Sequence, residues 1–240
     1  MKRAPVIARR ELSSYFFSPI AYVAMALFLI AAGVAFYSDF RPGQPAGMRS
    51  IFEQMVWMLV FIIPVLSMGL MAQEWSTGTI ETLMTAPVNE TDVILGKFTG
   101  SLGFLLILLA PTLLYVLMLR IFSTPSFDYG PIFSGYLGIV LVGALFIAIG
   151  LFCSSLTRSQ VVAAVTAAAI LAVATIIPWW ASGKATLGGF WRTAADQAIM
   201  SRYTDFSKGI IDLGNVVFFI AGTVVFLFIT VKVMESRRWK

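Results

Sequence analysis

Long runs of apolar residues dominate the chain, and shorter polar segments separate them. Six runs have the length of about 20 residues that an α-helix needs to cross a membrane. They are continuous and lack the polar–apolar alternation of barrel strands. The predicted spans are residues 19–38, 55–71, 93–119, 132–153, 161–180 and 214–233. The predicted fold class is therefore all-α, a polytopic membrane protein with a single transmembrane domain over residues 1–240.

The polar lead at residues 1–18 has the pattern of an amphipathic helix. Its apolar residues fall within an arc of about 120° on a helical wheel, and its bases, Arg9 and Arg10 among them, fall on the adjoining arc. We expect an interfacial helix at the level of the lipid headgroups. The first apolar run is too long for the core of a cleaved signal peptide, so it reads as an uncleaved span. The lead suits a membrane anchor or a lever that touches a cytosolic partner, and the two roles are compatible.

Composition supports the membrane assignment and excludes several kinds of chemistry. The chain is 59% hydrophobic and 12% charged, with a mean hydropathy of +0.88, whereas soluble domains carry about 25% charged residues. It has no histidine and a single cysteine, Cys153. Histidine-based catalysis, histidine metal sites and an intrachain disulfide are therefore excluded.

The distribution of basic residues predicts the orientation in the membrane. Six spans put both tails on one side, and both tails are basic, which favours a cytoplasmic N-terminus and a cytoplasmic C-terminus. The net charge of +5 fits such basic flanks better than nucleic-acid binding. The segment between the last two spans opposes this rule, because it would lie outside and yet carries Lys184, Arg192, Arg202 and Lys208.

The central parts of the six runs contain no Asp, Glu, Lys or Arg. Charges within a membrane commonly mark ion or proton paths, so their absence argues against an ion-coupled transporter or a proton pump. The Gly-Lys pairs at Gly96 and Gly183 are not followed by Ser or Thr, so the chain has no Walker A loop. The interpretation of the chain as an intramembrane protease has little support, since the sequence has no histidine and no intramembrane aspartate pair. We expect a non-enzyme whose energy comes from a partner.

The loop between the second and third spans is acidic, although a cytoplasmic loop is usually basic. Ser76, Thr77 and Gly78 offer caps and a break, the side chains of Ile80, Leu83 and Met84 share one helical face, and Pro87 ends the segment. This pattern predicts a short helix at residues 77–87 that lies parallel to the membrane. The helix either packs only on its own bundle or docks a cytosolic partner.

The same loop carries a resemblance to a known family. The run Glu74-x-x-x-Gly78-Thr79-Ile80-Glu81-x-Leu83-x-x-x-Pro87-Val88, followed by Ile94-Leu95-Gly96-Lys97-Phe98, resembles the permease subunit of ABC-2-type transporters, with the gliding-motility-associated permease as the nearest branch. Further agreeing stretches lie at residues 10–12, 18–20, 111–115, 148–157 and 206–212. The resemblance covers nearly the whole chain.

The resemblance implies roles for individual residues. Residues 77–87 would form the coupling helix, which sits in a groove of the ATPase. The coupling residues would be Glu74, Thr77, Gly78, Ile80, Glu81, Leu83, Met84 and Pro87. The lead would be the connecting helix, with Arg9, Arg10 and Glu11. Glu74 and Glu81 would pair with bases on the ATPase or on the connecting helix, for example Arg9 or Arg10.

The resemblance also implies partners and a function. Two copies of a cytosolic ABC ATPase would bind ATP and Mg²⁺, and this chain would hold no cofactor. A second permease copy or a homologous permease would complete the path, in contact with membrane lipid and with a possible periplasmic or membrane-anchored auxiliary protein. The chain would then belong to an exporter that moves an unidentified substrate out of the cytoplasm or membrane. The alternative is a mechanotransmission subunit that passes ATPase-driven work to periplasmic gliding or envelope machinery.

The segment at residues 181–213 is too long for a plain turn. Its apolar residues recur at helical spacing, and Trp191 and Tyr203 are of the types that favour the membrane interface. We expect one or two short external helices, with Trp191, Arg202 and Tyr203 as candidate contact residues. The segment is either a cap on the bundle, or an outer gate or contact for an extracytoplasmic partner. Elsewhere, Pro64 and Pro111 predict bends in the second and third spans.

Overall fold

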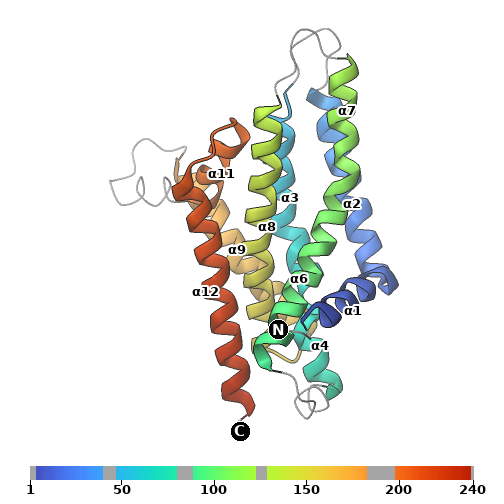
Figure 1. The fold of residues 1–240 in the computed structure, drawn as a ribbon, viewed down its shortest axis with the longest axis vertical. Coiled ribbons are helices and arrows are strands. Elements are labelled where there is room, and N and C mark those ends of the chain that lie inside the picture. The colour runs from blue at the N-terminus through green and yellow to red at the C-terminus, as the bar shows by residue number, and fades with distance from the viewer. Residues whose placement is uncertain (1–3, 40–46, 80–88, 123–128, 183–197, 239–240) are drawn as a thin grey trace.

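The computed structural model describes residues 4–39, 47–79, 89–122, 129–182 and 198–238. Helices make up nearly all of these residues, and no strand occurs among them (Figure 1). Six helical stretches within the described residues are long and apolar enough to cross a membrane. The predicted class, a polytopic all-α membrane protein, is confirmed.

The six candidate spans are built from eight helices and one 3₁₀ turn. They are α2 (Pro19–Asp39), α3 (Arg49–Ser67) with α4 (Gly69–Thr77), α6 (Glu90–Leu109) with η1 (Ala110–Thr112) and α7 (Leu113–Phe122), α8 (Gly130–Leu156), α9 (Gln160–Ser182) and α12 (Leu213–Arg238). Two shorter helices lie outside the spans, α1 (Ala4–Phe17) and α11 (Ile199–Ser207). The second and third candidate spans are longer than the apolar runs suggest, because polar residues continue the helices at their ends.

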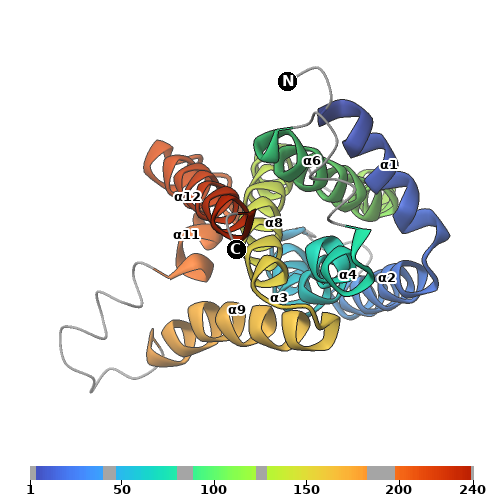
Figure 2. The ribbon, with the colours of Figure 1, turned by 90° about the horizontal axis from the view of Figure 1, so that it is seen from below.

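Helix α8 is the centre of the bundle. Its apolar window is 72% buried, against 22% for the window of α9, and Figure 2 shows α12, α6, α3 and α9 around it. Glycines on α8 let its neighbours approach. A Cβ at Gly138 would lie 2.8 Å from the Cβ of Phe206 on α11. Such a close contact is possible only because glycine has no side chain, as expected for close packing of helices in membranes.

Helix α1 lies obliquely along one side of the bundle, against α6, toward the end where α4 and the last turns of α12 also lie (Figures 1 and 2). We call this the α4 end. Two glycines of α6 accept α1 at close range. A Cβ at Gly96 would lie 2.7 Å from the Ile7 side chain, and one at Gly100 would lie 2.8 Å from the Ala8 carbonyl oxygen. The absence of side chains at these positions lets the backbone of α1 pack directly against α6.

Two of the spans are interrupted. In the third, Pro111 lies in the 3₁₀ turn η1 between α6 and α7, as expected where a proline removes a helical hydrogen bond. In the second, α3 contains Pro64 and gives way to α4 at Met68. Ser154 of α8 stabilises this second break. Its Oγ accepts hydrogen bonds from the backbone N–H groups of Met71 and Ala72, each at 3.0 Å, and donates to the Met68 carbonyl oxygen at 2.8 Å.

Candidate functional site

Three charged side chains from three different helices meet at the α4 end. Lys97 of α6 places its Nζ 3.2 Å from Oε2 of Glu11 on α1 and 2.9 Å from Oε1 of Glu74 on α4. The Lys97 side chain is only 4% exposed, and each glutamate side chain is 16% exposed. We call this arrangement the Glu11–Lys97–Glu74 cluster. One ammonium group therefore joins the helix before the first span to the end of the second span.

The local sequence explains how Lys97 reaches both partners. It lies beside Gly96 and one turn before Gly100, two positions at which the missing side chain of α6 lets α1 approach closely. One turn after Glu11 along α1, Tyr15 stacks on Phe104 of α6, with ring centroids 4.6 Å apart. The close approach of the two helices therefore removes both the lysine and the first carboxylate from water.

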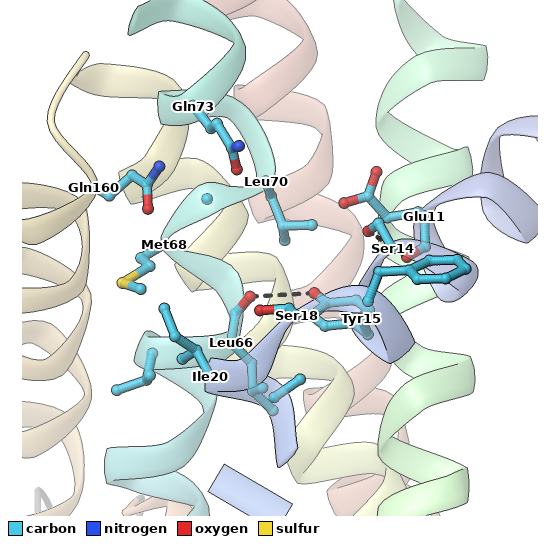
Figure 3. Close-up of a pocket in the computed structure, with 14 residues that line it drawn as sticks. Glu11, Ser14, Tyr15, Ser18, Ile20, Leu66, Met68, Leu70, Gln73 and Gln160 are labelled. Carbon is cyan, nitrogen blue, oxygen red and sulfur yellow. Dashed lines mark hydrogen bonds between the residues drawn. The ribbon is translucent and has the colours of Figure 1, made fainter. Parts of the chain in front are cut away.

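Tyr15 also links α1 to the second span through hydrogen bonds. Its hydroxyl shares a hydrogen bond with Ser101 Oγ at 2.9 Å and donates to the Leu66 carbonyl oxygen at 3.2 Å (Figure 3). Burial raises the pKa of the Tyr15 hydroxyl well above its usual range, and the nearby Glu11 carboxylate acts in the same direction. Tyr15 therefore stays a neutral donor, and it fixes α1 against the last turn of α3.

The cluster has more acceptors than its lysine can satisfy. It contains two carboxylates and one ammonium group, and the buried Oε2 of Glu74 has no hydrogen-bond partner among the described residues. Removing one partner of a buried ion pair costs about 3–5 kcal/mol, because the other charge then stays buried without compensation. The two ion pairs of Lys97 therefore link α1, α4 and α6 at one point.

A second contact joins α4 to the end of the last span. The Arg237 guanidinium lies 4.9 Å from the centre of the Trp75 ring, and its Nη2 donates to the Leu156 carbonyl oxygen at 2.6 Å. Trp75, the residue after Glu74, therefore faces the ends of α8 and α12. Helix α4 is held on one side by the cluster and on the other by this cation–π contact.

Among the described residues, Glu74 does not pair with Arg9 or Arg10, the two bases of the connecting helix named for it as examples. Its base is Lys97 within the third span, whereas Arg9 and Arg10 are exposed on α1. Glu11, expected on the connecting helix, does take part in the cluster. Lys97 was not among the predicted site residues, because it lies near the start of the third predicted span, outside the central part that lacks charged residues. A single lysine inside a predicted span, next to a glycine, was the signal that could have found it.

The predicted coupling helix lies mostly outside the described residues, which include neither Ile80, Glu81, Leu83, Met84 nor Pro87. Thr77 and Gly78 are described. Helix α4 continues to Thr77, and Gly78 follows it with a φ of 71°, the left-handed cap that often ends a helix. Thr77 Oγ1 donates to the Gln73 carbonyl oxygen at 2.9 Å. These residues therefore end a helical extension of the second span.

At the opposite end, α11 is packed into the bundle. The Arg202 Nη1 donates to Asn215 Oδ1 at 2.9 Å, and its guanidinium lies 4.3 Å from the centre of the Phe218 ring on α12. Ser207 Oγ lies 3.3 Å from Glu53 Oε1 on α3, to which it donates.

Tyr203 lies in the same helix, α11, and is fully buried. Burial raises its pKa well above the usual range, with a further contribution from Glu53. Arg202 and Tyr203 therefore contact the chain's own spans. Trp191 lies outside the described residues.

Comparison with known proteins places this architecture in a family. The sequence model of the ABC-2 family transporter proteins matches residues 6–237, nearly the whole chain. The chain belongs to the ABC-2 transporter family. No match was found among curated proteins. ABC-2 permeases are in general non-catalytic membrane subunits that work with a cytosolic ATPase subunit. The six candidate spans and the family together make this chain a multi-pass ABC-2 membrane protein.

Proposed function

We propose that this ABC-2 protein is the permease subunit of an ATP-driven exporter, and that the Glu11–Lys97–Glu74 cluster carries movement from the ATPase into the spans. The single observation that carries the proposal is the buried Lys97, which binds one carboxylate on α1 and one on α4. Helix α4 leads directly to the segment at residues 77–87 that the family resemblance assigns to the coupling helix. The connecting helix and α4, the helix that leads into the coupling segment, therefore share one ionic link.

The proposed mechanism is a lever that pivots at the break between α3 and α4. A push on the coupling segment displaces α4, and Ser154 holds the break against the central helix α8. Because separating the buried cluster would cost several kcal/mol, α1 and α6 follow α4 rather than detach from it. Closure of the ATPase dimer would in this way reorient the first three spans.

The orientation that suits this mechanism places the α4 end in the cytoplasm of a bacterial inner membrane. Both basic tails, the exposed Arg9 and Arg10, and the acidic loop would then face the ATPase. A second copy of the chain or a homologous permease would complete the path, and two ATPase subunits would bind ATP and Mg²⁺. Replacing Glu81 with Lys is expected to uncouple ATP hydrolysis from transport without preventing membrane insertion.

Mechanotransmission without a substrate is a second candidate, and one observation favours it. The outer helix α11 is tied to α3 through Ser207 and Glu53, and to α12 through Arg202 and Asn215. Movement of the spans would therefore reach the outer face, where a periplasmic gliding or envelope protein could receive it. ATP-dependent movement of a substrate in reconstituted vesicles would favour export over this alternative.

The test of the proposed function is purification of the tagged protein from its native cell in mild detergent, followed by mass spectrometry. We expect a stoichiometric soluble protein with the nucleotide-binding pattern GxxxxGK[ST]. The Lys97→Met variant, if it still inserts and folds, should retain this partner and lose the coupled activity. A well-folded preparation that carries no ATPase in any detergent would contradict the proposal and indicate a passive or scaffolding role.

A further inference from the structure

An open cleft of about 540 Å³ lies next to the cluster, between the α1–α2 corner, the break between α3 and α4, and the start of α9. Its volume is within the range of about 300–1,000 Å³ that ligand sites commonly have. Tyr15, which fixes α1 to α3, forms part of one wall, and Glu11 of the cluster forms another part. The cleft is therefore built on the elements that carry the proposed movement.

The cleft changes from polar to apolar along its length. In Figure 3 the side chains of Gln73 and Gln160 lie at the upper end and those of Glu11 and Ser14 lie on one side, whereas Ile20 lies lower, where α2 begins. The polar end is at the level of α1, and the apolar end is at the level where the spans start. This gradient matches a membrane lipid, with its headgroup at the interface and its acyl chains in the hydrocarbon.

The charge of the cleft selects among headgroups. Glu11 is the one charged residue among the described residues that line it, and neither Lys nor Arg lines it. Lys97 lies behind Glu11 and is shared with Glu74, so the cluster behind the wall has one more carboxylate than it has ammonium groups. An ammonium group therefore suits the cleft, and a headgroup with only negative charge does not.

We propose that this cleft binds one phospholipid with an amine headgroup, of the phosphatidylethanolamine class, from the leaflet next to α1. The lipid ammonium is placed near Glu11. The side-chain amides of Gln73 and Gln160 and the hydroxyl group of Ser18 are the donors available to the phosphate and ester oxygens. Ile20, Val65 and Leu66 supply the surface for the start of the acyl chains.

The bound lipid would contact the connecting helix and the second span at once. Its headgroup would therefore influence how firmly α1 follows α4, and the lipid composition of the leaflet would affect coupling. Binding itself requires no ATPase, so this inference can fail while the proposed function stands, and the reverse also holds.

Gly69 offers a variant that fills the cleft. A Cβ at this position would lie 3.3 Å from Oε1 of Gln73 and 4.0 Å from Oε1 of Gln160, so a side chain there extends toward the polar end. Gly69→Leu should exclude the headgroup. Gly47→Leu is the matched control, because nothing lies within 4 Å of a Cβ at Gly47, which precedes α3 at the opposite end of the bundle.

The experiment is native mass spectrometry of the purified full chain in detergent with equal amounts of phosphatidylethanolamine, phosphatidylcholine and phosphatidylglycerol. We expect one retained phosphatidylethanolamine, favoured over phosphatidylglycerol about tenfold or more, as for a contact with a charged hydrogen bond. Phosphatidylcholine, whose ammonium has no N–H, should fall between the two. Gly69→Leu should lose about tenfold of the retained lipid, and Gly47→Leu should retain it.

Three results would overturn the proposal: equal or stronger retention of phosphatidylglycerol, unchanged retention in Gly69→Leu, or an equal loss in Gly47→Leu. A second variant covers the case in which Gly69→Leu does not fold. Gln160→Leu removes a polar group from the wall at the start of α9 and should also lower the retention of phosphatidylethanolamine. If Gln160→Leu retains the lipid as the wild type does while Gly69→Leu is unfolded, the proposal is wrong.

Discussion

Replacing Lys97 with methionine should be among the most destabilising single changes in the α4 end of the protein. The methionine keeps the length of the side chain but removes the ammonium group between Glu11 and Glu74. At the observed separations of 3.2 and 2.9 Å, each pair is worth about 5–6 kcal/mol of Coulomb energy at an effective dielectric constant of about 20. Desolvation of the buried ions offsets part of this, and the net loss on removing one partner of a buried pair is about 3–5 kcal/mol.

The assay is thermal unfolding of the purified protein in detergent, followed by tryptophan fluorescence. If each kcal/mol shifts the melting temperature by about 2–4 °C, as in soluble chains of this size, Lys97→Met should melt about 6–20 °C below the wild type. Lys232→Met is the control. Lys232 lies 2.7 Å from Glu235, but the two side chains are 55% and 40% exposed, so its loss should cost at most about 1 kcal/mol.

A triple variant tests the cause of the effect. Glu11→Gln and Glu74→Gln added to Lys97→Met remove the two uncompensated carboxylates as well as the ammonium group. Because replacing a whole buried ionic group is often nearly neutral, this variant should recover most of the lost stability. A Lys97→Met protein that melts within about 2 °C of the wild type, less than the shift for 1 kcal/mol, would refute the reasoning. So would a triple variant no more stable than the single one.

Three further changes test the packing around the cluster and at the end opposite to α4. Gly100→Ala should cost about 1–3 kcal/mol in the same melting assay, because its Cβ meets the backbone of α1 at 2.8 Å. Gly103→Ala is the control and should be neutral, because its Cβ lies 3.7 Å from the nearest side chain. Equal effects of the two changes would contradict the tight contact at Gly100. Ser154→Ala leaves two buried backbone N–H groups of α4 without their acceptor and should cost about 1–3 kcal/mol. Ser155→Ala removes only a bond to a carbonyl of its own helix, so a matching loss would show that the break is not held by Ser154. Arg202→Met removes the donor to the buried side chain of Asn215 on α12 and should lower the melting temperature of the protein. An unchanged melting temperature would exclude a stabilising role for this contact.

Hydrophobic pattern predicted the spans because each apolar run is a local property of the chain. The six runs correspond to the six candidate spans, and Pro111 was expected to disturb the third span, where η1 lies. The polar extensions of α3, α4 and α6 were not visible in the same way, since Arg49, Glu53 and Glu90 carry no apolar signal. These residues continue the helices because backbone hydrogen bonds and the packing against α8 do not depend on hydropathy.

The cluster could not be derived from local pattern. Glu11 and Lys97 are 86 positions apart in the sequence, and nothing in the spacing of either helix states that α1 packs against α6. Gly96 and Gly100 explain the contact once it is known, but a glycine in a membrane helix has several other uses. Glu74 was predicted as a site residue from its place in the family motif. Its partner, Lys97, is evident only from the packing of α1, α4 and α6 against one another.

The most direct test of the central claim measures whether α1 and α4 move together. Spin labels at Ser13 and Ser76 would report the separation of α1 and α4, and labels at Ser13 and Ser236 the separation of α1 and α12. These serines donate only to carbonyls of their own helices, and Cys153 is buried. In the complex with its ATPase, addition of ATP should change the distance between positions 13 and 236 and leave the distance between 13 and 76 unchanged. A change between 13 and 76 as large as that between 13 and 236 would contradict the account.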